Sequence, residues 1–273
     1  MRRAFLALAA FLLMGGTAGA CGGDEACQTA DGEYHVLTPP DWDGQSPLSA
    51  ILHFHGGGSS GQAVVSNRPF VDPVLARGYA VIAPTSLVRP GRTRGGWSVD
   101  DGREPQRDEV AFAHQVLADA VERFGVDPNR TLVTGFSRGG SLVWDIACAS
   151  GPDFPAYASI AGGFWRPYQT ECKGPIQMFH VHGFVDTTVP LEGRPLRNGD
   201  FEQGDIFAGF QVLRATNQCT NLRPDEFDIS EGYRCRLWTE CGQPSDLRLC
   251  LHDGGHTVPP GWANRVLDWF EAL

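Results

Sequence analysis

Short apolar runs alternate with amphipathic stretches along most of the chain. The short runs, many rich in β-branched residues, predict strands, and the longer stretches with apolar residues at helical spacing predict helices. Strands are expected near 33–38, 50–55, 79–84, 131–135, 156–160, 176–182, 234–239 and 246–252. Helices are expected near 69–77, 108–124, 138–150, 205–217 and 261–272. The alternation through the first two thirds of the chain favours parallel βαβ units and a single α/β domain.

The first twenty residues have a different pattern. Arg2 and Arg3 precede an apolar run from 4 to 14, and small residues follow up to Ala20. This layout is typical of a signal peptide, and the run is too short to span a membrane. We therefore expect export, to an extracellular or periplasmic location. The expected divisions are a signal peptide over 1–20, an N-terminal segment over 21–31 and one α/β domain over 32–273.

The charge balance is acidic. The whole chain has 22 Lys+Arg against 32 Asp+Glu, a formal net charge of −10. Such a surface repels nucleic acid and anionic membranes, so we expect neither as a partner. No later stretch is apolar for long enough to span a membrane. We expect a monomer.

The most informative motif is Gly-Phe-Ser-Arg-Gly at 135–139, which follows a β-branched run and precedes a helical pattern. Gly-x-Ser-x-Gly between a strand and a helix is the signature of a nucleophile elbow. The glycines are needed because a Cβ at either flank would collide with neighbouring backbone. We predict that Ser137 is a nucleophile. The alternative is a glycine-rich turn that merely begins a helix.

The acid and the base of a triad are expected to follow such a serine in chain order. The apolar run 176–182 leads into a loop that carries Asp186, and the run 246–252 leads through two glycines to His256. Loops at the carboxyl ends of parallel strands are where open α/β sheets place functional residues. We predict that His256 takes the proton of Ser137 and that Asp186 holds the histidine tautomer. For His256 alone, a structural role is the alternative.

A glycine run follows the predicted strand 50–55 and the histidine at its end, His55. Glycines at 56–58 let backbone N–H groups approach a ligand, as in the His-Gly-Gly-Gly loop of an oxyanion hole. The predicted donors are the N–H groups of Gly57, or less directly Gly58, and of Arg138, the residue after the nucleophile.

These motifs resemble a known family. The matching segments are His-Gly-Gly at 55–57, Val-Asp-Pro-Asn-Arg at 126–130, Gly-Phe-Ser-Arg-Gly-Gly at 135–140, His-Gly-Phe-Val-Asp-Thr-Thr-Val-Pro at 182–190 and Gly-Gly-His-Thr-Val-Pro-Pro at 254–260. They are similar to the secreted polyhydroxybutyrate depolymerase and feruloyl esterase group, in the esterase-D-like and carbohydrate-esterase branch of the α/β-hydrolases. The resemblance runs from about residue 32 to the C-terminus. It implies a single-domain α/β-hydrolase with a mostly parallel eight-stranded sheet flanked by helices, no cofactor, and ester hydrolysis through an acyl-enzyme.

Two departures from the family pattern affect substrate preference. Arg138 is a long cation where relatives often have a smaller or neutral residue, and it could bind a substrate carboxylate or simply be solvated. The chain also reads His-Thr-Val-Pro-Pro-Gly-Trp from His256, where relatives often have His-Thr-Trp-Pro-Gly. Both departures leave the expected mechanism intact.

The substrate is the least determined property. Trp97, Phe164 and Trp165 are the expected aromatic wall of the binding site, although packing in the core is the alternative, above all for Trp262. No separate polymer-binding module is apparent, which favours small or oligomeric esters. Hydroxyalkanoate oligomers and feruloyl or acetyl esters of plant polysaccharide fragments both stay open.

Eight cysteines in an exported chain predict disulfides. A hairpin centred near 242–243 would place Cys235 opposite Cys250 at bridging distance. The other expected pairs are Cys219–Cys241, Cys148–Cys172 and, by remainder, Cys21–Cys27. The segment 17–21 is also a passable lipobox, so a lipoprotein anchored through Cys21 is the competing interpretation.

Two other classes of function compete with a serine esterase. His53 and His55, like His180 and His182, are spaced so that each pair faces one side of its strand, and such pairs can bind zinc. A metal-dependent hydrolase would leave the elbow and the triad order unexplained, so we predict no metal. A catalytically inactive fold that only binds carbohydrate or polymer is the other alternative.

Overall fold

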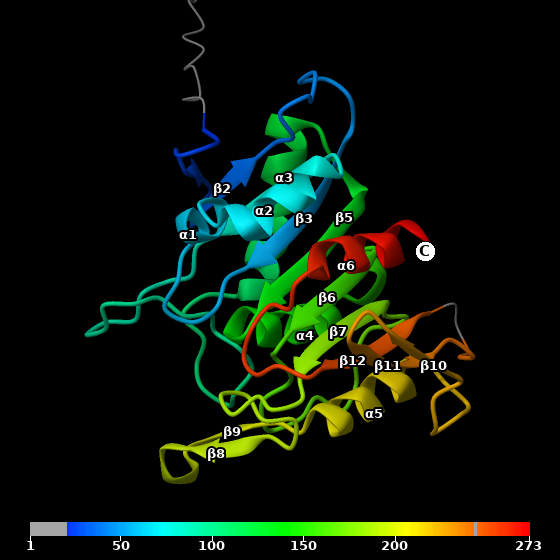
Figure 1. Cartoon of the computed structure of the whole chain (residues 1–273). Coiled ribbons are helices and arrows are strands. Elements are labelled where there is room, and N and C mark those ends of the chain that lie inside the picture. The colour runs from blue at the N-terminus through cyan, green and yellow to red at the C-terminus, as the bar shows by residue number, and fades with distance from the viewer. Residues whose placement is uncertain (1–20, 243–244) are drawn as a thin grey trace, which may run out of the picture.

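The structure is a computed structural model that describes residues 21–242 and 245–273 (Figure 1). The predicted signal peptide over 1–20 lies outside the described residues. Within those ranges, no helix has both the length and the apolar character needed to cross a bilayer.

A ten-stranded sheet forms the centre of the molecule. Its six central strands are parallel and the strands at both edges are antiparallel. In spatial order they are β1 (Cys27–Gln28), β2 (Glu33–Leu37), β4 (Tyr79–Pro84), β3 (Leu48–Phe54), β5 (Val126–Phe136), β6 (Ala156–Ile160), β7 (Met178–Gly183), β12 (Leu247–His252), β11 (Tyr233–Trp238) and β10 (Glu226–Ser230).

The expected number of eight strands is therefore wrong, because the sequence pattern missed both edge strands. β1 has only two residues, too few to show a period. β10 directs Phe227 and Ile229 to solvent, where they are 63% and 76% exposed. In β10 these two residues alternate with polar ones, which is the period of a strand, so its sequence did carry a signal that the expected strands omit.

Helices cover both faces of the sheet (Figure 1). One face packs against α1 (Gly61–Val65), α2 (Arg68–Ala76) and α6 (Trp262–Glu271), and the other against α3 (Glu109–Phe124), α4 (Arg138–Ser150) and α5 (Ile206–Thr216). Successive strand residues face opposite sides, so Ile51 enters the first core and Leu52 the second. Two 3₁₀ turns (Gly151–Asp153 and Arg197–Gly199) and a small hairpin of β8 (Arg194–Leu196) and β9 (Phe201–Gln203) complete the chain.

The parallel arrangement brings distant segments to one edge of the sheet. β3, β5, β7 and β12 run in the same direction, so their carboxyl ends lie together. The loops that leave these ends carry Gly57, Ser137, Asp186 and His256. Sheet topology thus positions residues that are far apart in the chain.

The structure contains four disulfides, and they join the same pairs that the sequence suggested: Cys21–Cys27, Cys148–Cys172, Cys219–Cys241 and Cys235–Cys250. Cys235 of β11 lies directly opposite Cys250 of β12 in the antiparallel register. Because β12 leads into the loop with His256, this bridge holds the strand that delivers the histidine.

We expect the double variant Cys235→Ser, Cys250→Ser to lose about 2–5 kcal/mol of unfolding free energy, the usual effect of removing a native bridge. It should also lower kcat more than it raises KM, because β12, from which the loop with His256 leaves the sheet, would no longer be bridged to β11. Denaturant unfolding and steady-state kinetics measure the two effects. The matched control is Cys21→Ser with Cys27→Ser, which removes a bridge at the opposite edge and should leave kcat unchanged. An equal fall in kcat in both double variants would contradict this role.

Candidate active site

Ser137 occupies a sharp turn between β5 and α4. Its backbone has φ 57° and ψ −120°, a conformation that costs a non-glycine residue free energy. A Cβ at position 135 would lie 2.3 Å from the carbonyl oxygen of Gly139, and one at 139 would lie 2.0 Å from that of Phe54. The two glycines of the motif therefore allow the close backbone packing that holds Ser137 in this turn.

Hydrogen bonds connect Ser137, His256 and Asp186 in a line. Nδ1 of His256 lies 2.7 Å from Oδ2 of Asp186, and its Nε2 lies 2.9 Å from Oγ of Ser137. A carboxylate only accepts, so Nδ1–H donates to Asp186 and Nε2 accepts from the serine hydroxyl. The three residues that the sequence singled out are thus brought together in the order required of nucleophile, base and acid.

The loops with the acid and the histidine are joined to each other. Phe184 N–H donates to the carbonyl of His252 at 2.8 Å, and Val185 N–H donates to that of Gly254 at 3.2 Å. A Cβ at position 183 would lie 2.2 Å from the carbonyl oxygen of Gly255, so only glycine allows this approach. The loops therefore pack as one unit.

Two backbone donors lie beside the serine. Gly57 and Arg138 are adjacent, since a Cβ on Gly57 would be 3.8 Å from that of Arg138. Gly58 is unsuited to the same role, because its N–H donates to the carbonyl of Gly95 at 2.9 Å. Of the two glycines considered from the sequence, Gly57 is the better placed.

The Arg138 side chain is held by partners within the protein, and 20% of it is exposed. Its Nε donates to the carbonyl of Trp97 at 2.8 Å, and Nη2 lies 3.1 Å from Oδ2 of the buried Asp101. The indole N–H of Trp97 in turn donates to the carbonyl of His55 at 2.7 Å. Trp97 thus ties together the two segments that carry the candidate oxyanion donors, a connection absent from the sequence pattern.

The predicted aromatic wall stays a prediction, and all three of its rings are largely buried. Trp97 is fully buried, Phe164 is 3% exposed and packs edge-on against Trp144, and Trp165 is 8% exposed with its N–H bonded to Ser141. Trp97 and Trp165 both contact Arg138, the residue after Ser137, and the Trp165 ring lies 4.9 Å from its guanidinium.

An apolar cleft of about 830 Å³ adjoins His256 instead. Phe70 and Trp262 stack in it with ring centroids 5.8 Å apart, and Phe136 lies 4.9 Å from the His256 ring. Its other apolar lining residues are Pro69, Pro73, Val258, Pro259, Pro260 and Ala263. The sequence did not identify Phe70 as a cleft residue, because no motif surrounds it. Phe136 could have been identified, because it directly precedes Ser137 in the Gly-Phe-Ser-Arg-Gly motif.

The side chains of both His-x-His pairs make hydrogen bonds within the protein. Nδ1 of His53 hydrogen bonds with the Thr134 hydroxyl at 2.8 Å, and burial lowers the pKa of His53 to about 3 and that of His55 to about 4. His180 and His182 bond to each other at 3.0 Å. In the described part of the chain, no three His, Cys, Asp or Glu side chains gather as a metal site would require.

Known proteins resemble this chain over most of its length, although no protein-family model matches it. The probable feruloyl esterase C of Aspergillus niger is 25% identical over 232 residues, which cover 84% of this chain and 77% of that protein. Feruloyl esterase C of Emericella nidulans is 27% identical over 231 residues, with the same coverages. Feruloyl esterase D of Neurospora crassa is 26% identical over 233 residues, covering 82% and 73%.

Solved structures agree on the fold. Acetyl xylan esterase from Aspergillus awamori superposes with a TM-score of 0.63 at 14% identity, over 88% of this chain and 94% of that one. A Bacillus cereus carboxylesterase superposes with a TM-score of 0.54 at 12% identity, over 89% and 95%. This chain is a carboxylic ester hydrolase of the α/β-hydrolase fold. As expected for this hydrolase, the sheet is mostly parallel and flanked by helices.

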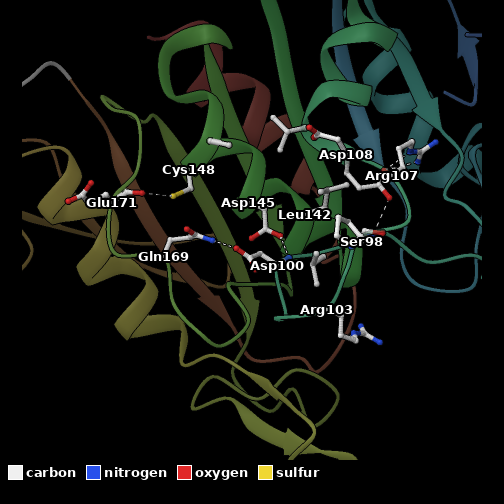
Figure 2. A pocket seen from close by; sticks show the side chains of 15 residues that line it. Ser98, Asp100, Arg103, Arg107, Asp108, Leu142, Asp145, Cys148, Gln169 and Glu171 are labelled. Atoms are coloured by element: carbon white, nitrogen blue, oxygen red, sulfur yellow. Dashed lines mark hydrogen bonds and ion pairs between the residues drawn. The ribbon is translucent and has the colours of Figure 1, made fainter. Parts of the chain in front are cut away.

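The hydrolase has a second cavity, of about 360 Å³, which the triad residues do not line (Figure 2). Leu142, Asp145 and Cys148 reach it from one side of α4, and Gln169 lies opposite with its amide toward Asp100 (Figure 2). Burial raises the pKa of Asp145 from 3.8 to about 7, although the N–H of Asp100 bonds to it at 2.9 Å and opposes the shift.

We expect Asp145→Asn to stabilise the hydrolase more at pH 8 than at pH 4. Between pH 3.8 and about 7 the folded protein holds a proton on Asp145 that the unfolded chain has released, so unfolding free energy falls as pH rises through this window. The asparagine removes that dependence. Denaturant unfolding across the pH range measures it, with the exposed Asp41→Asn as control. A difference between wild type and Asp145→Asn that stays constant with pH would contradict the raised pKa.

Proposed function

We propose that this hydrolase cleaves esters by a serine mechanism in which Ser137 is the nucleophile, His256 the general base and Asp186 the orienting acid. The observation that carries the proposal is the unbroken hydrogen-bonded line from the hydroxyl of Ser137 through both nitrogens of His256 to Asp186. This is the geometry by which a neutral imidazole activates a serine.

In the first half of the reaction, Ser137 Oγ attacks the ester carbonyl carbon while its proton passes to Nε2 of His256. The carbonyl oxygen becomes an oxyanion, which the N–H groups of Gly57 and Arg138 stabilise. Loss of one such donor typically costs roughly 3–4 kcal/mol of transition-state stabilisation. The tetrahedral intermediate then expels the alcohol, which takes the proton from Nε2 and leaves an acyl-Ser137.

In the second half, a water molecule attacks the acyl carbonyl and gives a proton to Nε2. Collapse of this second intermediate releases the carboxylic acid and returns the proton to Ser137 Oγ. Asp186 keeps its charge throughout and stabilises the imidazolium that forms twice in each cycle. The cycle needs no cofactor.

The proposed substrates are feruloyl or acetyl esters of plant polysaccharide fragments. The names of the sequence relatives support the first and that of the acetyl xylan esterase supports the second. The apolar cleft beside His256, with its stacked rings and prolines, suits an aromatic group. Hydroxyalkanoate oligomers are the competing substrates.

We propose export of the enzyme without a lipid anchor, as a monomer. Four disulfides support an oxidising compartment. The sulfur of Cys21 is joined to Cys27, and a sulfur in a disulfide is not available for a thioether-linked lipid.

Ser137→Ala should reduce kcat by at least a thousandfold, because the base would have no hydroxyl to activate, while the fold persists. Hydrolysis of p-nitrophenyl acetate and a circular dichroism melting curve measure activity and folding. The exposed Ser46→Ala is the control and should match wild type. Residual activity within tenfold of wild type would refute the assignment, and a wild type that binds polysaccharide without cleaving esters would favour an inactive binding protein.

A substrate panel tests the acyl preference. We expect kcat/KM for methyl ferulate to exceed that for hydroxybutyrate oligomers by at least tenfold, because the apolar cleft favours a flat ring. The same panel on Phe70→Ala should show a larger loss for methyl ferulate than for p-nitrophenyl acetate. A preference for the oligomers would replace polysaccharide esters by hydroxyalkanoates as the proposed substrates.

A further inference from the structure

His180 and His182 on β7 have no part in the reaction just described, yet both rings are fully buried. Burial lowers the pKa of both histidines, that of His180 well below its ordinary value. Both rings are therefore neutral, and each has one nitrogen that donates and one that accepts. Buried polar rings of this kind require partners at both nitrogens, because an unpaired buried group costs stability.

Each ring nitrogen of the two histidines has a partner, and together these contacts form one chain of hydrogen bonds. The indole Nε1 of Trp144 lies 3.3 Å from Nδ1 of His180. Nε2 of His180 lies 3.0 Å from Nδ1 of His182, and Nε2 of His182 lies 2.7 Å from the carbonyl oxygen of Val189. The chain thus runs from the elbow helix α4, across β7, to the loop that follows Asp186.

The direction of every hydrogen bond in this chain is determined by its two ends. An indole N–H can only donate, so Nδ1 of His180 accepts and the proton of that ring is on Nε2. Nδ1 of His182 then accepts from His180, which leaves the proton of His182 on Nε2. That proton meets the carbonyl of Val189, which can only accept. The donor at one end and the acceptor at the other both require the Nε2–H tautomer of the two histidines, so the hydrogen bonds run in one direction only.

The far end of the chain holds the catalytic acid. Val189 N–H donates to Oδ1 of Asp186 at 2.9 Å, while its carbonyl receives the proton of His182. Nε2 of His182 also lies 3.5 Å from Oδ2 of Asp186, the oxygen to which His256 donates. His182 therefore contacts the acid directly and also through the residue that binds it.

We propose that His180 and His182 are positioning residues, which hold Asp186 in register with His256 by a hydrogen-bond chain of fixed direction that begins at Trp144. The inference rests on the proposed function, because it assigns these histidines to the triad of that same site. α4 begins directly after Ser137 and carries Trp144, so one helix positions the nucleophile at its start and the acid through the buried chain. The Asp186 carboxylate keeps its orientation while the imidazolium of His256 forms and disappears.

The direction of the chain can be measured without any activity. Nitrogen-15 NMR of the histidine rings in the folded protein distinguishes the two neutral tautomers and the imidazolium. We expect both His180 and His182 as the neutral Nε2–H tautomer at pH 7. Either ring as the Nδ1–H tautomer, or charged, would overturn the proposal whether or not the protein hydrolyses esters. Loss of activity in Ser137→Ala bears only on the nucleophile, so the two results are separable.

Kinetics test whether the chain positions the acid. His182→Leu should lower kcat about 100-fold with KM within threefold of wild type, because a displaced acid misaligns His256 and not the substrate. His182→Gln keeps an N–H donor of similar reach, so its kcat should be at least tenfold higher than that of His182→Leu. Equal kcat values for the leucine variant and wild type would overturn the positioning role, as would equal losses in the two variants.

Two further variants cover the case in which His182→Leu does not fold. Trp144→Phe keeps an aromatic ring and removes only the donor that starts the chain. The carbonyl of Val189 still requires the Nε2–H tautomer of both rings, but Nδ1 of His180 loses its partner, so the chain should be held less firmly and kcat should fall at least threefold. His114→Gln is the matched control, since His114 bonds to Ser150 at 3.0 Å and has no contact with Asp186. It should lose stability without any loss of kcat. An unchanged kcat in Trp144→Phe would contradict the proposal.

Discussion

The site depends on one close backbone contact, between the start of α4 and the end of β3. Gly139 lies so near the carbonyl of Phe54 that a side chain there has no room, and this packing holds Ser137 at its positive φ. The hydroxyl of Ser137 in this strained turn lies 2.9 Å from Nε2 of His256, and Arg138, the next residue, lies beside Gly57. The strained backbone of Ser137 costs free energy, and the packing of the start of α4 against the end of β3 offsets that cost.

Around this contact, neutral hydrogen bonds and one buried ion pair fix the remaining parts. Trp97 links the carbonyl of His55 with the side chain of Arg138, whose charge is balanced by Asp101. An unpaired guanidinium this close to the proposed oxyanion donors would need solvent, and the ion pair removes that need. The charged groups beside the triad are thus held by partners within the protein, since Asp101 pairs with both Arg138 and Arg103.

Several features follow from sequence because they depend on neighbours in the chain. The elbow needs its own glycines, and the turn length between β11 and β12 sets the register that pairs Cys235 with Cys250. The expected helices agree with the structure to within one or two residues, since each has a clear apolar face. β10 was not among the expected strands, although Phe227 and Ile229 alternate with polar residues at the period of a strand.

The sequence by itself determined the class of fold, the nucleophile motif and the chain order of serine, acid and histidine, since these depend on local backbone sterics and on parallel βαβ periodicity. Only the tertiary structure decided which aromatic rings face the site. Trp97 packs against Phe54 and His55 and Phe164 packs against Trp144, whereas Phe70 and Trp262, almost two hundred residues apart, stack in the cleft beside His256. Only the structure revealed the direction of the Trp144–His180–His182 chain. A sequence lists donors and acceptors, but a tautomer is fixed by the partner at each end, and those partners meet only when the sheet and its helices have packed.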